Sequence, residues 1–139
     1  MKAKTFSIVI VCTIIFYACS SAPKNPGTGI NYFIGNFEQA INEATKQNKP
    51  VFIYCHTTWC GYCKKMERST FKEKEVDDYM NANYINLYYN MEEGEGIYIK
   101  NKYNINSYPA YIFLDSSGAL KFIEFGYMSM SSFMNLARK

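Results

Sequence analysis

The chain has 139 residues, of which 48% are hydrophobic and 19% are charged, and its formal net charge is +3. This length and apolar fraction fit one globular domain and exclude an intrinsically disordered chain. Lys2 and Lys4 lie in an expected leader, and removing them lowers the net charge from +3 to +1. A charge so near zero gives no electrostatic footprint for a phosphate backbone, so we expect no nucleic-acid partner.

The first 18 residues have the features of a secretory signal peptide. Two lysines precede an uncharged apolar run over residues 6–18, which is shorter than the roughly 20 residues that a membrane-spanning helix needs. Residues 16–19 resemble a bacterial lipobox, in which the cysteine, here Cys19, is lipidated and becomes the mature N-terminus. Phe16 and Tyr17 depart from the usual residues of that motif, so an uncleaved anchor or simple secretion stays open.

This leader sets the expected domain organisation and location. We expect a signal peptide over residues 1–18, a lipidated N-terminus and flexible tether over residues 19–30, and one folded domain over residues 31–139. The domain would lie outside the cytoplasm, on the periplasmic side of a bacterial membrane, and Cys19 would anchor it there through its lipid.

Periodicity in the rest of the chain predicts an α/β fold. Helical patterns cover residues 37–48 (capped by Asn36), 60–81 (interrupted near 69–71), 95–103 and 129–139. Apolar runs typical of strands cover residues 51–55, 84–89, 110–115 and 120–125. Because only a short turn at residues 116–118 separates the last two strands, they should form an antiparallel hairpin. The order of elements predicts a central mixed β-sheet flanked by helices.

Three cysteines remain in the expected domain, namely Cys55, Cys60 and Cys63. An odd number argues against a purely structural disulfide framework. In an oxidising compartment, a surviving Cys-x-x-Cys pair is either a redox couple or a metal clip.

Cys60 and Cys63 come directly after the loop that follows the first buried strand. A helix that begins at Cys60 offers unpaired N–H groups and the positive end of its dipole, and both favour a thiolate there. Cys63 lies on the same helical face, so the two sulfurs can bond. We expect Cys60 to be the exposed attacking thiol and Cys63 the shielded thiol that resolves the mixed disulfide. Trp59 should pack beside the attacking sulfur, and Tyr62 should be exposed to the partner protein.

A second loop carries Tyr108 and Pro109 directly before a buried strand. A proline at the first residue of a strand removes no needed donor, and that alone would explain it. A cis bond there would instead bring the backbone close to the sulfurs. The Tyr108 backbone could then pair with an extended substrate. We expect the substrate to contact Trp59, Gly61, Tyr62 and Tyr108.

Together these motifs resemble the thioredoxin-like superfamily, and in particular exported bacterial thioredoxin-related lipoproteins with a WCxxCK motif. The resemblance rests on residues 49–53, 59–66, 108–110 and 113–118, and it covers residues 33–139. It implies a thioredoxin fold, with Cys60 as nucleophile, Cys63 as resolving thiol and Pro109 as the cis-proline. It also implies thiol–disulfide exchange without a cofactor, with protein disulfides as substrates and a membrane electron-relay protein as the source of thiols.

Two departures from the family pattern concern proton transfer. Thioredoxins carry a buried acid six residues before the first cysteine, where this chain has Tyr54, and Asn86 takes the place of the partner lysine. A phenol with a reference pKa near ~10 is a poor base at neutral pH. Water or Glu67, one turn after Cys63, could accept the proton instead, although a solvated charge on the helix surface is the plainer interpretation of Glu67.

Two functions therefore remain. The first is a membrane-tethered thiol–disulfide oxidoreductase that works in the reducing direction, with the oxidase or isomerase direction left open. The second is a Zn²⁺- or Cu⁺-binding module that uses Cys55, His56, Cys60 and Cys63. Against the module, Cys55 and His56 would point to opposite faces of an extended segment. The plainer interpretations are a buried apolar Cys55 and a solvated His56 in the loop.

Overall fold

A computed structural model describes residues 27–139, so the expected signal peptide, Cys19 and most of the tether lie outside the described residues. The helices are α1 (Phe37–Gln47), α2 (Gly61–Arg68), α3 (Lys74–Asn83), α4 (Gly94–Lys102) and α5 (Met130–Ala137), with a 3₁₀ turn, η1, at Thr70–Lys72. The strands are β1 (Val51–His56), β2 (Ile85–Asn90), β3 (Ala110–Leu114) and β4 (Leu120–Phe125). Every element expected in this part of the chain is present. Between residues 27 and 139, no helix is both long and apolar enough to cross a membrane.

The strands form one mixed sheet in the order β2-β1-β3-β4. Strand β1 is parallel to β2 and antiparallel to β3, and β3 and β4 form the expected antiparallel hairpin. The parallel pair requires a crossover, which α2, η1 and α3 provide. The architecture is the thioredoxin fold, a mixed sheet flanked by helices, as the sequence predicted.

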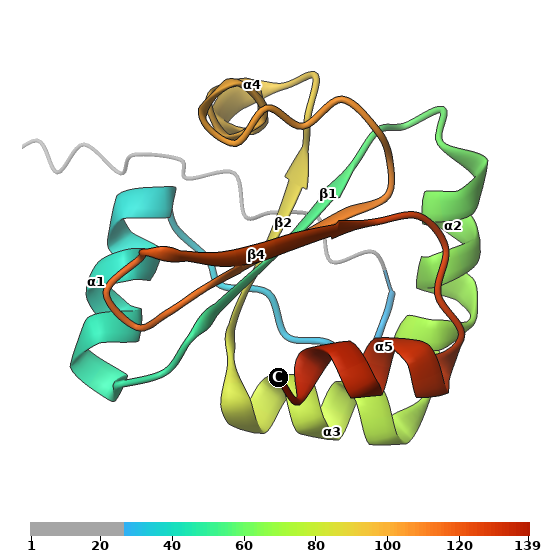
Figure 1. Ribbon diagram of the computed structural model, residues 1–139, viewed down its shortest axis with the longest axis horizontal. Coiled ribbons are helices and arrows are strands. Elements are labelled where there is room, and N and C mark those ends of the chain that lie inside the picture. The colour runs from blue at the N-terminus through green and yellow to red at the C-terminus, as the bar shows by residue number, and fades with distance from the viewer. Residues whose placement is uncertain (1–26) are drawn as a thin grey trace, which may run out of the picture.

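Strand β1 lies at the centre of the structure, and all six of its residues are buried. Its side chains alternate between two apolar clusters, as the pleat requires. Phe52 and Tyr54 pack in the cluster that also holds residues of α2, α3 and α5. Val51, Ile53 and Cys55 pack in the cluster formed with α1 and α4. Figure 1 shows α3 and α5 below the sheet and α4 above it. The carboxyl end of β1 therefore leads from a rigid core directly into the loop before Cys60.

Local side-chain hydrogen bonds explain two of the boundaries. At the start of α1, the Asn36 side chain accepts the Gln39 N–H at 2.8 Å, and the Gln39 side chain accepts the Asn36 N–H at 2.9 Å. This reciprocal capping satisfies two backbone donors that would otherwise lack partners. In the β3–β4 turn, one Asp115 oxygen accepts the backbone N–H groups of Ser117 at 2.8 Å and Ala119 at 3.0 Å. These bonds hold the tight turn that makes the hairpin.

The domain begins earlier than the expected boundary at residue 31. Thr28 and Ile30, which fall within the expected tether, are buried. The Phe33 N–H donates to the Asn86 carbonyl of β2 at 2.8 Å. This N-terminal segment therefore lies along the outer edge of β2, where the sheet would otherwise present unpaired backbone groups.

Gly96 of α4 allows this helix to pack closely on the end of β2. A Cβ at position 96 would overlap the Asn90 carbonyl group. Gly96→Ala gains up to about 1 kcal/mol of helix propensity. We nevertheless expect it to lower the free energy of unfolding by about 1–3 kcal/mol, because the backbone must shift to make room. Urea denaturation measures the change. Gly61→Ala is the matched control, because a Cβ there meets nothing within 4 Å. Equal stability of Gly96→Ala and wild type would contradict the close packing.

Candidate active site

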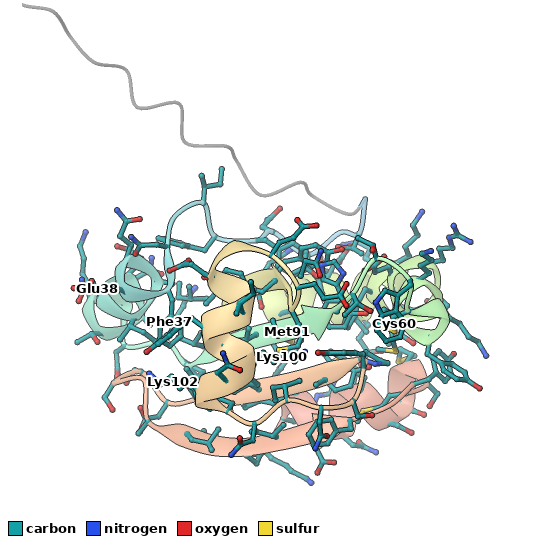
Figure 2. All side chains as sticks on the ribbon, turned by 90° about the horizontal axis from the view of Figure 1, so that it is seen from above. Phe37, Glu38, Cys60, Met91, Lys100 and Lys102 are labelled. Atoms are coloured by element: carbon teal, nitrogen blue, oxygen red, sulfur yellow. A yellow bond between two sulfur atoms is a disulfide. The ribbon has the colours of Figure 1, made fainter. Side chains whose placement is uncertain are left out.

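Cys60 and Cys63 form a disulfide at the start of α2 (Figure 2). Their sulfurs are 2.07 Å apart and their Cα atoms 5.3 Å apart. Cys60 is the N-cap of α2, and its sulfur accepts the backbone N–H of Cys63 at 3.0 Å. The structure thus brings together the two sulfurs that the spacing places on one turn, with a helix N-terminal N–H directed at the first of them.

The two cysteines differ less in exposure than expected. Cys60 is 5% exposed and Cys63 is 1% exposed. The disulfide and the hydrogen bond from the Cys63 N–H hold the Cys60 sulfur against the N-terminus of α2. Cys60 is therefore largely buried in the disulfide form. The expectation of an exposed Cys60 is wrong for this form, although Cys60 is the more accessible of the pair.

The proline loop lies beside the disulfide. The Tyr108–Pro109 peptide bond is cis. The Pro109 carbonyl accepts the N–H of Gly126 at 2.8 Å. The Tyr108 ring stands edge-on to the Trp59 ring, with centroids 6.0 Å apart. Because Trp59 directly precedes Cys60, this contact brings the proline loop next to the cysteine pair.

Exposed aromatic rings flank the pair. Trp59 is 65% exposed, and its indole N–H donates to Glu92 at 2.9 Å. The Trp59 ring therefore lies mostly in solvent and contacts Glu92 and Tyr108, and its packing beside the attacking sulfur stays a prediction. Tyr62 is exposed as expected, at 63%. Its ring centroid lies 6.5 Å from that of Tyr127, over which the Lys65 ammonium sits at 4.2 Å. These rings give the surface around the disulfide an apolar, aromatic character.

The two positions where thioredoxins carry a buried acid and a lysine are polar but do not titrate near neutral pH. Tyr54 is fully buried, and its hydroxyl donates to the Cys63 carbonyl at 3.1 Å. Burial raises the pKa of Tyr54 far above its ordinary value. Asn86 is 2% exposed and donates to the Met80 carbonyl at 3.2 Å. Tyr54 therefore ties the start of α2 to the sheet, and neither residue can accept a proton from a thiol.

Glu67 is half-buried and points toward the sheet, so its interpretation as a solvated surface charge is wrong. Its carboxylate accepts the Tyr88 hydroxyl at 3.0 Å. Burial raises the pKa of Glu67 above its usual value, against the opposing effects of the Tyr88 hydrogen bond and the charges of Arg68 and Lys64. Residues four apart on a helix are neighbours on one face, which puts this carboxyl group one turn from Cys63. Glu67 is therefore a half-buried, ionisable carboxyl group one helical turn after Cys63.

His56 is also not the solvated loop residue that the sequence predicted. It is the last residue of β1 and is 8% exposed. Its ring centroid lies 4.1 Å from that of Tyr88 and 6.0 Å from that of Tyr54. Burial lowers the pKa of His56 to about 4. The imidazole is therefore neutral at physiological pH and forms part of an aromatic layer under the active-site loop.

The alternative metal-binding module finds no support in the geometry. Cys55 is fully buried among residues of α1 and α4, and burial raises the pKa of its thiol. His56 packs on Tyr88, on the opposite face of β1 from Cys55. Cys60 and Cys63 are bonded to each other. In the described part of the chain, no three His, Cys, Asp or Glu side chains gather as metal ligands would. The interpretation of Cys55 as a buried apolar residue is confirmed.

Two residues near the site, Tyr88 and Tyr127, were not predicted from the sequence. Tyr88 pairs with Tyr54 in the parallel register of β1 and β2, so aligning the two expected strands could have found it. Tyr127 directly follows Gly126, whose backbone hydrogen bond to Pro109 holds the segment at the site. No local pattern marks Tyr127, because its neighbours come from α2.

Comparisons with known proteins agree with this geometry. A family model described as thioredoxin-like matches residues 33–116. A candidate disulphide isomerase from Bacteroides thetaiotaomicron is 33% identical in sequence, with a TM-score of 0.69 over 81% of this chain and 95% of that one. The reduced C-terminal domain of Neisseria meningitidis DsbD is 21% identical, with a TM-score of 0.60 over 73% and 90% of the two chains.

The curated relatives are much longer proteins. Thiol:disulfide interchange protein DsbD of Campylobacter jejuni is 27% identical over 85 residues, which are 60% of this chain and 15% of that protein. The matched segments cover between 7% and 15% of the length of these relatives.

The neutral, buried His56 should make the fold sensitive to acid. The unfolded chain takes up a proton near the ordinary pKa of ~6.5, whereas the folded chain does so only near 4. Stability is therefore lost as pH falls from the first value to the second. His56→Phe keeps the ring stack and removes the proton. We expect its loss of unfolding free energy between pH 7 and pH 4.5 to be about 1–2 kcal/mol smaller than that of wild type, as measured by urea denaturation. Identical losses would show that His56 is not held neutral.

Proposed function

The chain belongs to the thioredoxin-like family, and from this premise we propose that it is a membrane-tethered thiol–disulfide oxidoreductase that reduces disulfides of extracytoplasmic proteins. The observation that carries the proposal is the Cys60–Cys63 disulfide at the start of α2, next to the cis Tyr108–Pro109 loop. The two sulfurs store two electrons when reduced, so no cofactor is needed for the exchange.

The reaction proceeds in two displacements. The Cys60 thiolate attacks one sulfur of the substrate disulfide, whose S–S bond breaks and releases the first substrate thiolate. A mixed disulfide now joins Cys60 to the substrate. Cys63 then attacks the Cys60 sulfur, which releases the second substrate thiolate and forms the Cys60–Cys63 disulfide. The substrate gains two electrons and the protein loses two.

The second displacement requires Cys63 to lose its proton, because the thiolate is the nucleophile. Tyr54 cannot accept this proton, since burial keeps its pKa high. Glu67 is ionisable, half-buried and one turn away on the same helix. We assign it the role of proton acceptor, from which the proton passes to water. Glu67 of α2 thus has the role that a carboxylate on the strand has in typical thioredoxins.

One feature of the site, the Glu67 carboxylate, supports the reducing direction. A half-buried carboxylate one turn from Cys63 disfavours negative charge on that sulfur, which lowers the stability of the reduced form relative to the disulfide. The Cys63 N–H, which favours a thiolate on Cys60, acts in the opposite direction, and strong oxidants of this fold depend on a stabilised reduced form. Isomerisation is the alternative direction, and the description of the Bacteroides relative favours it. Equilibration against glutathione separates the two, since a reductase has the lower potential.

We propose that Trp59, Gly61, Tyr62 and Tyr108 contact the substrate. Two of these rings are mostly in solvent beside the sulfurs, and a side chain at Gly61 would meet open space. Aromatic residues with exposed faces are the groups that most often carry binding energy at protein interfaces. Backbone pairing at Tyr108 would hold an extended segment of the substrate against Cys60.

The remaining parts of the proposal concern location and supply of electrons. A signal peptide over residues 1–18 and a lipid on Cys19 would hold the domain at the periplasmic side of a membrane, through the tether that follows. Each turnover leaves the protein oxidised, so a dithiol donor must reduce it again. We propose a membrane electron-relay protein as that donor, and the similarity to thiol:disulfide interchange protein DsbD supports a partner in thiol–disulfide exchange.

Substitution of the two cysteines tests the exchange mechanism. Cys60→Ser should reduce insulin no faster than buffer does, because the attacking thiol is gone. Cys63→Ser keeps the attack but not the resolution, so it should accumulate mixed disulfides that are visible on a non-reducing gel. Insulin reduction by Cys60→Ser at the wild-type rate, or a Cys63→Ser protein that traps no partner, would contradict the mechanism.

Metabolic labelling of the full chain with a fatty acid tests the tether. Wild type should carry the label and sediment with membranes, whereas Cys19→Ala should lose the label and leave the membrane fraction. The change lies outside the expected folded domain in the sequence, so disulfide exchange by the purified variant should equal that of wild type. An unlabelled wild-type chain in the soluble extracytoplasmic fraction would refute lipid anchoring and leave the exchange mechanism intact.

A further inference from the structure

The N-terminal segment 28–33 is bound to the fold by contacts from three elements. The Asn81 side chain of α3 accepts the Asn31 N–H at 2.7 Å and donates to the Gly29 carbonyl at 3.0 Å. The Gly29 N–H donates to the Phe71 carbonyl of η1 at 3.4 Å. Tyr32 forms a parallel bridge with Asn86 of β2. The segment is therefore an ordered strap that crosses the edge of the sheet next to α3.

Tyr32 carries this strap into the surroundings of Glu67. Its ring centroid lies 5.2 Å from that of Tyr88, whose hydroxyl donates to the Glu67 carboxylate at 3.0 Å. The Tyr32 hydroxyl is itself buried. Burial raises the pKa of Tyr32, Tyr54 and Tyr88, and the negative charge of Glu67 raises the pKa of each of them further. Tyr88 of β2 thus bonds to the carboxyl group of α2, and the rings of Tyr32 from the strap and Tyr54 from β1 pack on Tyr88.

We propose that the strap is part of the redox site, with Tyr32 as a positioning residue that covers Tyr88 and thereby keeps water from the Glu67 carboxylate. The inference rests on the proposed function, because it concerns the group to which we assign the Cys63 proton. It extends that function to a segment whose residues 28–32 lie before the matched family region, which begins at residue 33.

The strap acts through the cost of holding a charge out of water. Two charged groups near Glu67, Lys64 and Arg68, come from its own helix. The titratable groups on the side of the sheet are Tyr32, Tyr54 and Tyr88, with His56 behind Tyr88. The phenols and the imidazole are neutral at physiological pH, so burial is the largest influence on the carboxyl group. Removing the Tyr32 ring would let water reach the carboxylate and lower the pKa of Glu67 toward its ordinary value.

The sign of the effect on catalysis follows. Only ionised Glu67 can accept the Cys63 proton, so the rate of disulfide closure rises as pH rises through the pKa of this carboxyl group. This rise is the acid limb of the pH–rate profile. Because burial raises the pKa of Glu67, the acid limb lies at a higher pH than it would with an exposed glutamate. Without the Tyr32 ring, the limb should move to lower pH and closure on the limb should be about two- to fivefold faster.

Stopped-flow fluorescence of the full chain measures closure, because Trp59, the single tryptophan, is next to Cys60. Reduced protein is mixed with saturating insulin at a series of pH values. We expect Tyr32→Ala to shift the acid limb to lower pH and Tyr32→Phe, which keeps the ring, to restore the wild-type profile. Tyr98→Ala is the matched control, since Tyr98 is an exposed tyrosine on α4. It should leave the profile unchanged.

A Glu67→Gln background separates this inference from the proposed function. Glu67→Gln alone should abolish the limb, and Tyr32→Ala should then have no further effect on the profile. If Glu67→Gln leaves the limb in place, Glu67 is not the proton acceptor and the inference is overturned along with that assignment. If Glu67→Gln abolishes the limb but Tyr32→Ala does not move it, the assignment stands and the role of the strap is overturned. A shift shared by Tyr32→Ala and Tyr98→Ala would also overturn that role.

Discussion

The hydrogen bond from the Cys63 N–H to the Cys60 sulfur is the interaction on which the site depends. It exists because Cys60 takes the N-cap position of α2, where a backbone donor of the first turn has no partner within the helix. The buried strand β1 fixes the direction of the chain into that position. The Tyr54 hydroxyl, bonded to the Cys63 carbonyl, holds the same turn against the sheet. The packing of the core thus fixes the direction of the Cys63 N–H toward the Cys60 sulfur.

On the inner side of this turn, a layer of phenols and one imidazole replaces the buried acid of typical thioredoxins. Tyr54 and His56 come from β1, and Tyr88 comes from the adjacent strand. The layer is neutral, so it places no charge next to the disulfide. The carboxyl group that bonds to this layer comes from α2. Glu67 enters from the helix side and bonds to Tyr88. The half-buried acid of this chain therefore lies on α2, one turn after Cys63, and not on the strand.

Periodicity and motif spacing predicted the order of elements, the mixed sheet and the closeness of Cys60 and Cys63. These features depend on residues near each other in sequence, or on the alternation of a buried strand. His56 and Glu67 were misjudged, because both contact Tyr88 of β2, which is distant from them in sequence. The strap begins with Thr28 and Gly29, which continue the small and polar residues of the expected tether, and its contacts with α3 and β2 show that it is ordered.

Titration of the Cys60 thiol in the reduced protein, followed by the pH dependence of its alkylation, tests the central claim most directly. A backbone donor at a helix N-terminus should hold the pKa of this thiol below the ~8.5 of a free cysteine, so that Cys60 is alkylated first and already reacts at neutral pH. A pKa at or above that value, or faster alkylation of Cys63 than of Cys60, would contradict the proposed arrangement of attacking and resolving thiols.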